Sequence, residues 1–234
     1  MSTHPGHVDR KSPYYGLEKV VLMMPRFCLS IVLAWSCACM AQATSDIALP
    51  KPQLDKGRPL MQVLKDRKSS RVFDTRPIPP QELSNLLWAA FGINRPEKGG
   101  RTAPSALDRQ EIDVYVSSLD GLFLFQANNH SLKKIHGKDI RETTGRQPFV
   151  KDAPLNIILV ADYTRVKKSV DSDGRQYAAA DAAFISENIY LYCASEGLAT
   201  VVRASIEKPS LATAMNLRPD QEVIFAQTVG YPKK

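Results

Sequence analysis

The sequence predicts an α+β sandwich in which helices flank a mixed central sheet. Three observations favour this class. Helical and strand periodicities alternate along the chain from about residue 60 onward. Two strand-like segments are separated by the turn Asp120-Gly121, which is typical of a hairpin. Residues 177–195 are apolar around most of a helical circumference, so we expect this helix to be buried on more than one side, in a core or against a second subunit.

Two helices are predicted in the first half of the chain. Apolar residues recur at helical spacing over 60–64 and precede the charged run 65–67, which predicts a short amphipathic helix. Residues 79–92 predict a second helix, because two prolines suit its first turn and a glycine suits its end. We expect residues 44–59 to form a linker or an arm on the surface, and residues 94–101 to form an exposed loop.

Strand patterns dominate the middle of the chain. An alternating segment at 112–116 and an apolar segment at 122–125 flank the predicted hairpin turn. The near-continuous apolar run 155–160 predicts a strand buried at the centre of the sheet. The remaining predicted elements are a strand at 198–202, a helix at 210–217 and a last strand at 223–229.

Composition and charge exclude several classes of protein. The 234 residues are 44% hydrophobic and 24% charged, which fits one or at most two globular domains and excludes a low-complexity or disordered chain. The net charge of +7 comes from basic residues spread along the chain, which favours small anionic ligands over nucleic acid. No apolar stretch in the body of the chain reaches the roughly 18 residues that a membrane helix needs.

The N-terminal region has the pattern of a secretory signal. Arg26 precedes the apolar run 27–35, which gives way to small residues and the triplet Ala41-Gln42-Ala43, a typical cleavage site. We therefore expect residues 1–43 to be removed and the mature protein to be exported, to the periplasm. If the signal is misidentified, the protein is cytoplasmic.

The start of this signal and its cysteines leave alternatives open. The polar sequence upstream suggests Met23 or Met24 as the true start. A retained N-terminal anchor is one alternative, and lipid attachment at Cys37 or Cys39 is another, although neither cysteine follows a lipobox. The mature chain keeps a single cysteine, Cys193, which lies on the apolar helix and is expected to be a small core residue without a disulfide.

Common catalytic motifs are absent from the sequence. It has no GxGxxG after a strand, no GxxxxGK[ST], no GxSxG, no HExxH and no CxxC, which removes the usual basis for NTPase, hydrolase and metalloenzyme functions. His130 and His136 lie in a polar, loop-like stretch that predicts no metal site. The run Arg67-Lys68-Ser69-Ser70-Arg71 follows a predicted helix and is able to bind a phosphate, or it is an ordinary basic helix end.

Four segments, in order along the chain, carry a resemblance to a known family. They are 67–74 with 77–79 (R-x-S-x-R-x-F), 102–106 (P-S-A-x-N-x-Q-P), 196–203 and 227–232. Together they resemble the FMN-dependent nitroreductases over residues 60–234, and the segment 86–93 is most similar to the SagB-type dehydrogenase branch, relatives of the thiazoline oxidases. The resemblance implies a three-layer sandwich and an intertwined homodimer with FMN at the subunit interface.

The resemblance also implies roles for individual residues. The FMN phosphate and ribityl chain would be held by Arg67, Lys68, Ser69 and Arg71. The phosphate site would be completed by the late residues Lys233 and Lys234. The isoalloxazine would be lined by Pro104, Ser105 and Ala106 of the other subunit. The stretch Arg203, Ala204 and Ser205 matches the place where the family offers a backbone N–H to flavin N5.

Two features near the predicted flavin remain open. Arg203 is a candidate for the positive charge near N1/O2 that favours reduced flavin, and the alternative is an ordinary arginine at a strand end. Asp108 stands where the family often has Asn, and Arg109-Gln110-Glu111 replaces the usual Q-P-W. An anion at this place would disfavour reduced flavin unless Arg109 pairs with it, which puts Asp108 and Gln110 in doubt as flavin contacts.

The implied function is an FMN-dependent oxidoreductase that moves hydride or electron pairs between flavin N5 and a small organic substrate. An exported enzyme would be reduced by its substrate or by a redox partner, whereas a cytoplasmic one would be an NAD(P)H-dependent nitro- or quinone-reductase. The alternative is an exported flavin-binding protein without turnover. We expect the loops 94–101 and 137–151 to set substrate specificity.

Overall fold

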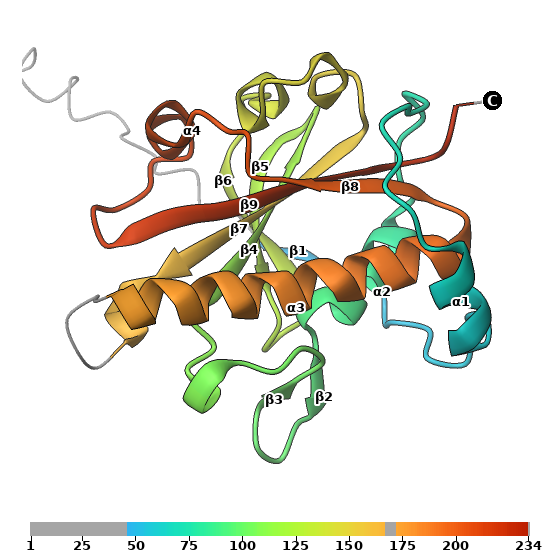
Figure 1. Ribbon diagram of the computed structural model, residues 1–234, viewed down its shortest axis with the longest axis horizontal. Helices are drawn as coiled ribbons and strands as arrows, with labels where there is room; N and C mark the ends of the chain where they lie inside the picture. The colour runs from blue at the N-terminus through green and yellow to red at the C-terminus, as the bar shows by residue number, and fades with distance from the viewer. Residues whose placement is uncertain (1–45, 167–171, 234) are drawn as a thin grey trace, which may run out of the picture. The chain divides into compact units, whose positions relative to one another are not determined.

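The computed structural model describes residues 46–166 and 172–233, shown in colour in Figure 1. The predicted signal, residues 1–43, and Lys234 lie outside the described residues. Among the helices that the structure describes, none is long and apolar enough to span a membrane.

A seven-stranded sheet in the order β1-β6-β5-β4-β7-β9-β8 forms the centre of the fold. Its strands are β1 (Ile47–Ala48), β4 (Ile112–Ser118), β5 (Gly121–Gln126), β6 (Ser131–His136), β7 (Leu155–Asp162), β8 (Ala199–Arg203) and β9 (Gln221–Gly230). The predicted hairpin and the predicted strands at 155–160, 198–202 and 223–229 are therefore confirmed. All eight residues of β7 are buried, because β4 and β9 pair with its two edges and helices cover both of its faces.

Every pairing in this sheet is antiparallel, which corrects the expectation of a mixed sheet. The reason lies in β9. Strands β7 and β8 point in the same direction and are joined by a long helix, as in a parallel crossover, but β9 inserts between them and is antiparallel to both. The local pattern of strand, helix and strand does not reveal a later strand that fills the gap.

Helices cover the two faces of the sheet, so the α+β sandwich class is confirmed (Figure 1). The helices are α1 (Leu60–Asp66), α2 (Pro80–Phe91), α3 (Ser172–Glu196) and α4 (Lys208–Ala214), with 3-10 turns η1 (Ala106–Asp108), η2 (Arg141–Thr144), η3 (Pro148–Val150) and η4 (Tyr163–Arg165). One face of β7, with Ile157 and Leu159, packs against α2 and α3. The opposite face, with Ile158 and Val160, packs against α4 and the residues around η2. The four predicted helices all form, within a few residues of the expected bounds.

Two segments differ from the sequence-based expectation. The predicted loop 94–101 forms a small hairpin, β2 (Ile93–Arg95) and β3 (Gly100–Arg101), since Gly99 adopts a φ of +64° and lets the chain reverse. The stretch at 131–136 is strand β6 rather than a loop, because its backbone pairs with β5 although lysines occupy much of its exposed face. Cys193 is fully buried and free, as predicted, and burial raises the pKa of its thiol.

Candidate functional site

The basic segment 67–71 is anchored where α1, α3 and β8 meet. Ser70 donates its backbone N–H to the carbonyl of Thr200 in β8, at 2.9 Å. The Oγ of Ser69 lies 2.8 Å from the phenol oxygen of Tyr190 in α3, and that oxygen also accepts the backbone N–H of Val202 at 3.0 Å. Arg67 lies over the Tyr190 ring, 5.3 Å from its centroid. One tyrosine thus joins the basic segment to both a helix and a sheet edge.

The cations of this segment are not neutralised by the protein. Among the described residues, no carboxylate forms an ion pair with Arg67, Lys68, Arg71 or Lys233. The nearby acid, Asp66, is paired with another arginine of the preceding segment, whose hydrogen bond lowers the pKa of Asp66. The C-terminal segment lies beside the basic segment, because Lys233 donates its N–H to the carbonyl of Val72 at 3.5 Å. This arrangement leaves positive charge available for an external anion.

The outer edge of β8 continues from this segment with unpaired backbone donors. Successive N–H groups along a strand alternate in direction, so Val202 and Ala204 both direct theirs away from β9. The N–H of Val202 reaches Tyr190, whereas the N–H groups of Ala204 and Ser205 have no acceptor among the described residues. Both residues are exposed. Two free donors therefore lie at the end of the strand that the basic segment borders.

Replacing Tyr190 by phenylalanine should loosen this junction. The change keeps the buried ring but removes the oxygen that joins Ser69 and Val202, so we expect a loss of about 1–2 kcal/mol in the free energy of unfolding. Chemical denaturation measures the loss, with the fluorescence of Trp88, the one tryptophan among the described residues, as the probe. The matched control is Tyr177→Phe, an exposed tyrosine in the first half of α3, which should change stability little. Equal stability of the Tyr190 variant and the parent protein would contradict this role.

Arg203, the candidate for the positive charge near the flavin, is buried within the protein. Its side chain is 6% exposed and donates to the carbonyl of Thr144 at 2.6 Å, to Oδ1 of Asn156 at 2.9 Å and to Oγ1 of Thr228 at 2.9 Å. All three partners are neutral, and burial lowers the pKa of Arg203 to about 10, so it stays a cation at neutral pH. A Cβ on Gly145 would overlap the guanidinium, so the loop packs directly on it.

The guanidinium is thus held by protein groups of the fold itself. The side chain lies under the loop that contains η2, on the α4 face of the sheet, where it supports the end of β8. The same loop is held to the strand end by the N–H of Arg146, which donates to the carbonyl of Ser205 at 3.3 Å. This packing agrees with an arginine at a strand end, and a role of Arg203 near a flavin stays a prediction. The backbone of 203–205 stays a candidate cofactor contact.

The second predicted segment, 104–106, begins a strained loop on the other side of α3. Leu107, Asp108 and Gln110 have φ values of 56°, 52° and 50°, a backbone region that residues other than glycine rarely adopt. Ala106 donates its N–H to Oδ2 of Asp181 in α3 at 2.9 Å. Such concentrations of strain are common at binding sites, where the surrounding structure holds them in place.

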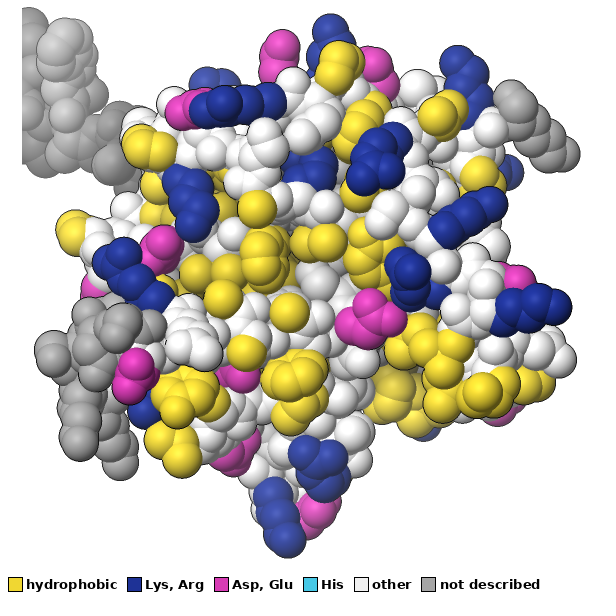
Figure 2. Space-filling view, in the orientation of Figure 1, with side chains coloured by type: hydrophobic (Ala, Val, Ile, Leu, Met, Phe, Trp, Pro, Cys, Tyr) yellow, Lys and Arg dark blue, Asp and Glu magenta, His cyan; other side chains and the backbone are white. Residues whose placement is uncertain are grey.

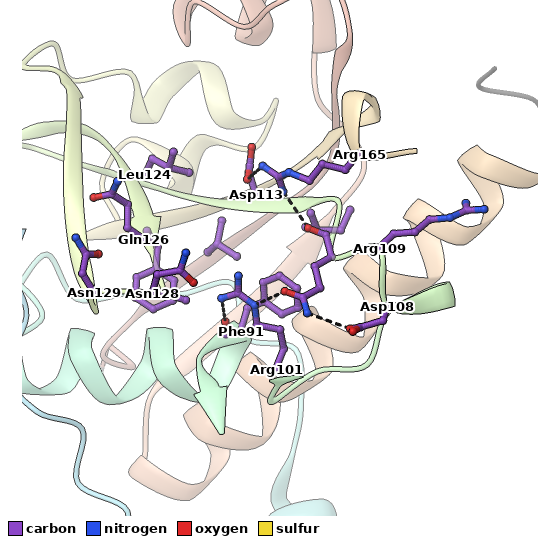
Figure 3. A pocket seen from close by; sticks show the side chains of 15 residues that line it. Phe91, Arg101, Asp108, Arg109, Asp113, Leu124, Gln126, Asn128, Asn129 and Arg165 are labelled. Carbon is purple, nitrogen blue, oxygen red and sulfur yellow. Dashed lines mark hydrogen bonds and ion pairs between the residues drawn. The ribbon is translucent and has the colours of Figure 1, made fainter. Parts of the chain in front are cut away.

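The loop borders a cavity of about 820 Å³ (Figure 3). Gln110 accepts from Nε of Arg101 at 2.8 Å, and Arg165 pairs with Asp113 at 2.6 Å, so these two arginines are already occupied. Arg109 points away from the cavity and lies over the ring of Tyr177, 5.8 Å from its centroid. Asp108 accepts a hydrogen bond from the side chain of Gln110 instead of pairing with Arg109. The ion pair that would offset the negative charge of Asp108 therefore does not form.

The structure brings the predicted residues 67–71, 203–205 and Lys233 to one region of the molecule, and it keeps the predicted residues 104–106 apart from them. Tyr190, at the basic segment, and Asp181, at the strained loop, are nine residues apart on α3, which corresponds to about 14 Å along the helix. One chain therefore holds two separate groups of predicted site residues. Tyr190 and Asp181 were not singled out from the sequence, because nothing local distinguishes a polar residue on the packed face of a helix.

Comparison with known proteins adds the last observation. The model of the family described as the nitroreductase family matches residues 64–231. A candidate nitroreductase of Methanocaldococcus jannaschii is 30% identical over 168 residues, which cover 68% of this chain and 83% of that protein. The crystal structure of a candidate nitroreductase from Ralstonia eutropha JMP134 is 43% identical, with a TM-score of 0.77 over 81% of this chain and 90% of that one. A microcin synthetase complex from E. coli, at 14% identity and a TM-score of 0.66, shares the fold over 92% of this chain and 85% of that one.

Proposed function

This chain belongs to the nitroreductase family of oxidoreductases, and from that premise we propose that it is an FMN-dependent enzyme acting on a small organic substrate. The observation that carries the proposal is the basic segment 67–71, with its unneutralised cations beside the free N–H groups at the end of β8. Its donor set suits a phosphorylated, hydrogen-bonding cofactor.

The phosphate end of the cofactor would be held by the basic segment. Arg67 and Arg71 offer guanidinium forks, and Lys68 and Lys233 add positive charge. Ser69 is fixed by Tyr190, so its hydroxyl would be oriented before the cofactor binds. These groups are exposed or half-buried, which leaves them accessible to a ligand.

The ring end would be held by backbone groups. The free N–H groups of Ala204 and Ser205 are fixed dipoles that favour negative charge developing on a bound ring. When bound, FMN supplies the redox chemistry by exchanging a hydride at N5 of its ring. Residues 104–106 would contribute from the other subunit of a dimer. The chain's own role is then to bind, to orient and to exclude water rather than to transfer protons.

We propose a homodimer because α3 leaves an apolar stripe uncovered. Tyr177 and Phe184 are 45% and 48% exposed, and Leu107 of the strained loop is 80% exposed. Figure 2 shows apolar side chains gathered over the front of the molecule, around α3 and α1. Large apolar side chains at helical spacing on a solvent face are typical of an interface. If the stripes of two copies of the chain packed against each other, the basic segment of one chain would come within reach of residues 104–106 of the other.

The visible absorption spectrum of the purified protein tests the cofactor. We expect a yellow protein that releases about one FMN per chain, because each chain has one basic segment and one end of β8 to hold the cofactor. Light scattering of the same sample should give the mass of a dimer. A colourless protein that also refuses added FMN would overturn the cofactor and the enzyme assignment together.

Turnover separates the enzyme from a flavin-binding protein. An enzyme of this family would have its flavin reduced by an electron donor and reoxidised by an acceptor in repeated cycles. Candidate donors are NAD(P)H and, for an exported protein, an organic substrate or a redox partner. The SagB-type branch is our proposed subgroup, and it favours the dehydrogenase direction. A flavin that binds but is not reduced by any of these donors would support the alternative, a binding protein without turnover.

We also propose export through the signal at 1–43. Mass spectrometry of the protein isolated from fractionated cells should give Thr44 as its first residue and place it outside the cytoplasm. A protein that keeps the preceding residues in the cytoplasmic fraction would contradict export and favour the NAD(P)H-dependent reductase.

A further inference from the structure

The wall of the cavity beside the strained loop contains a cation that the protein holds in place but does not neutralise (Figure 3). Arg101 of β3 donates its Nε to Oε1 of Gln110 at 2.8 Å and its Nη1 to the carbonyl of Phe91 at 3.3 Å. Both acceptors are neutral. Among the described residues, no carboxylate forms an ion pair with Arg101 and no acceptor meets its Nη2. The guanidinium therefore keeps one nitrogen and its charge for a ligand.

We propose that this cavity binds a small organic molecule with a single carboxylate, whose anion is held by Arg101 and whose apolar body contacts the apolar lining. The cavity has a volume of about 820 Å³, which lies in the range of small-molecule sites. Its lining includes the buried side chains of Phe91, Val114 and Phe125. A guanidinium matches the planar geometry of a carboxylate better than any other side chain does.

Arg101 is fixed in position before a ligand arrives. Its partner Gln110 is one of the strained residues, and two backbone bonds hold it in that conformation. Gln110 donates its N–H to Oγ of Ser105 at 3.0 Å, and its carbonyl accepts from Nη1 of Arg165 at 2.9 Å. The Arg101 guanidinium also lies over the ring of Phe91, 5.0 Å from its centroid. A cation that is already immobilised loses little conformational freedom on binding, and strain of this kind is common at binding sites.

The other charged groups in the lining favour one negative charge on the ligand. Arg165 is paired with Asp113 at 2.6 Å and needs no external anion. Asp108 accepts from Nε2 of Gln110 at 3.0 Å, so the Gln110 side chain separates it from Arg101. Burial and then the charge of Arg165 lower the pKa of Arg101, against smaller effects of Asp108 and Asp113. A carboxylate at Nη2 would stabilise this cation, whereas a dianion such as phosphate would be repelled more strongly by the two aspartates.

Neutral polar groups line the opposite side of the cavity. Figure 3 shows the side chains of Gln126, Asn128 and Asn129 across from Arg101, where the chain turns from β5 to β6. Gln126 and Asn129 accept from the hydroxyl of Ser131 at 3.1 and 2.8 Å, whereas the Asn128 amide has no partner among the described residues. Amides offer both donors and acceptors, so they suit polar substituents of the ligand and leave recognition of the charge to Arg101.

The carboxylate site is a property of the cavity and needs no cofactor. The strained loop in its wall directly follows residues 104–106, which were predicted to contact the flavin ring. That the bound carboxylate is the substrate of the enzyme therefore rests on the proposed function, whereas binding of the carboxylate does not.

Fluorine NMR of the purified protein with two matched probes tests the site. The probe 4-fluorobenzoate carries the charge, and 4-fluorobenzamide has nearly the same shape without it. The parent protein should bind 4-fluorobenzoate at least about tenfold more tightly than 4-fluorobenzamide. Arg101→Gln should abolish this preference, and Arg101→Lys should keep part of it. Lys98→Gln, which removes an exposed charge from the same hairpin, should behave as the parent protein.

A second variant tests the site without altering the β2–β3 hairpin. Asn128→Asp adds a negative charge across from Arg101 on an exposed turn, so it should weaken binding of 4-fluorobenzoate about fivefold and leave binding of 4-fluorobenzamide nearly unchanged. Asn94→Asp adds the same charge at an exposed position outside the cavity lining, and it should have little effect on either probe.

Several results would overturn the carboxylate site. They are failure of 4-fluorobenzoate to bind, equal affinity for the two probes, and a preference for 4-fluorobenzoate that persists in Arg101→Gln or is unchanged in Asn128→Asp. Displacement by inorganic phosphate, or loss of the probe in the double alanine variant of Arg67 and Arg71, would place it at the basic segment instead. Failure to bind FMN with intact binding of 4-fluorobenzoate would overturn the proposed function and leave the carboxylate site standing.

Discussion

Replacing Arg203 with alanine is expected to cost about 4 kcal/mol in the free energy of unfolding. The variant would leave the carbonyl of Thr144 and the side chains of Asn156 and Thr228 without their charged donor, at about 1.5–3 kcal/mol for each such bond, offset in part because a buried charge is removed. It would also leave a cavity under the loop that contains η2. Urea denaturation followed by circular dichroism measures the loss.

Two further variants separate the causes of this effect. Arg203→Met fills most of the volume but restores no donor, so it should recover only the part of the loss that comes from the cavity. Arg146→Ala removes an exposed arginine of the same loop, whose side chain pairs with Glu207 at the start of α4. This variant should lose much less, since exposed ion pairs contribute little. If the alanine variant at 203 were as stable as the parent protein, the guanidinium would have no structural role, and its assignment to the flavin would have to be reconsidered.

Removing the two arginines of the basic segment should abolish tight FMN binding. Arg67 and Arg71 would each lose a charge-assisted contact to the phosphate, at about 1.5–3 kcal/mol apiece, so the double alanine variant should bind FMN at least about 100-fold more weakly. Neither side chain has a carboxylate partner among the described residues, so the double variant breaks no ion pair of the fold. Titration of the apoprotein followed by flavin fluorescence measures the affinity.

Matched variants show whether the effect belongs to this segment. Lys138→Ala with Lys151→Ala removes the same charge from exposed positions elsewhere and should leave FMN affinity nearly unchanged. Riboflavin, which lacks the phosphate, should bind the parent protein weakly and lose little in the double variant. Equal loss of FMN and riboflavin would show that the arginines act on something other than the phosphate. Unchanged FMN affinity would remove the basic segment from the site.

Much of the fold could be predicted because its signals are local. The run at 155–160 is apolar on both faces and became the fully buried β7, and the turn at Asp120-Gly121 joined β4 and β5. The chemistry of the basic segment was visible for the same reason, since its cations and hydroxyls lie within five residues. Strand β6 was missed because its backbone pairing, not its side chains, makes it a strand.

The candidate site was only partly predictable, because its support is not local. Tyr190 and Asp181 lie within a helix whose apolar pattern predicts burial but not which polar atom meets which loop. Arg203 sits at a strand end in either interpretation, and only the packing of the loop over it decides that the side chain is buried.

The sequence by itself determined the periodicities, the family signature and the residue types available to hold an anionic cofactor. Those properties depend on neighbours along the chain, where spacing and chemistry are fixed by the covalent order. The tertiary structure alone decided the insertion of β9 between β7 and β8 and the burial of Arg203. Each of these depends on contacts between segments far apart in the chain, whose free energy is set by packing and burial rather than by local preference.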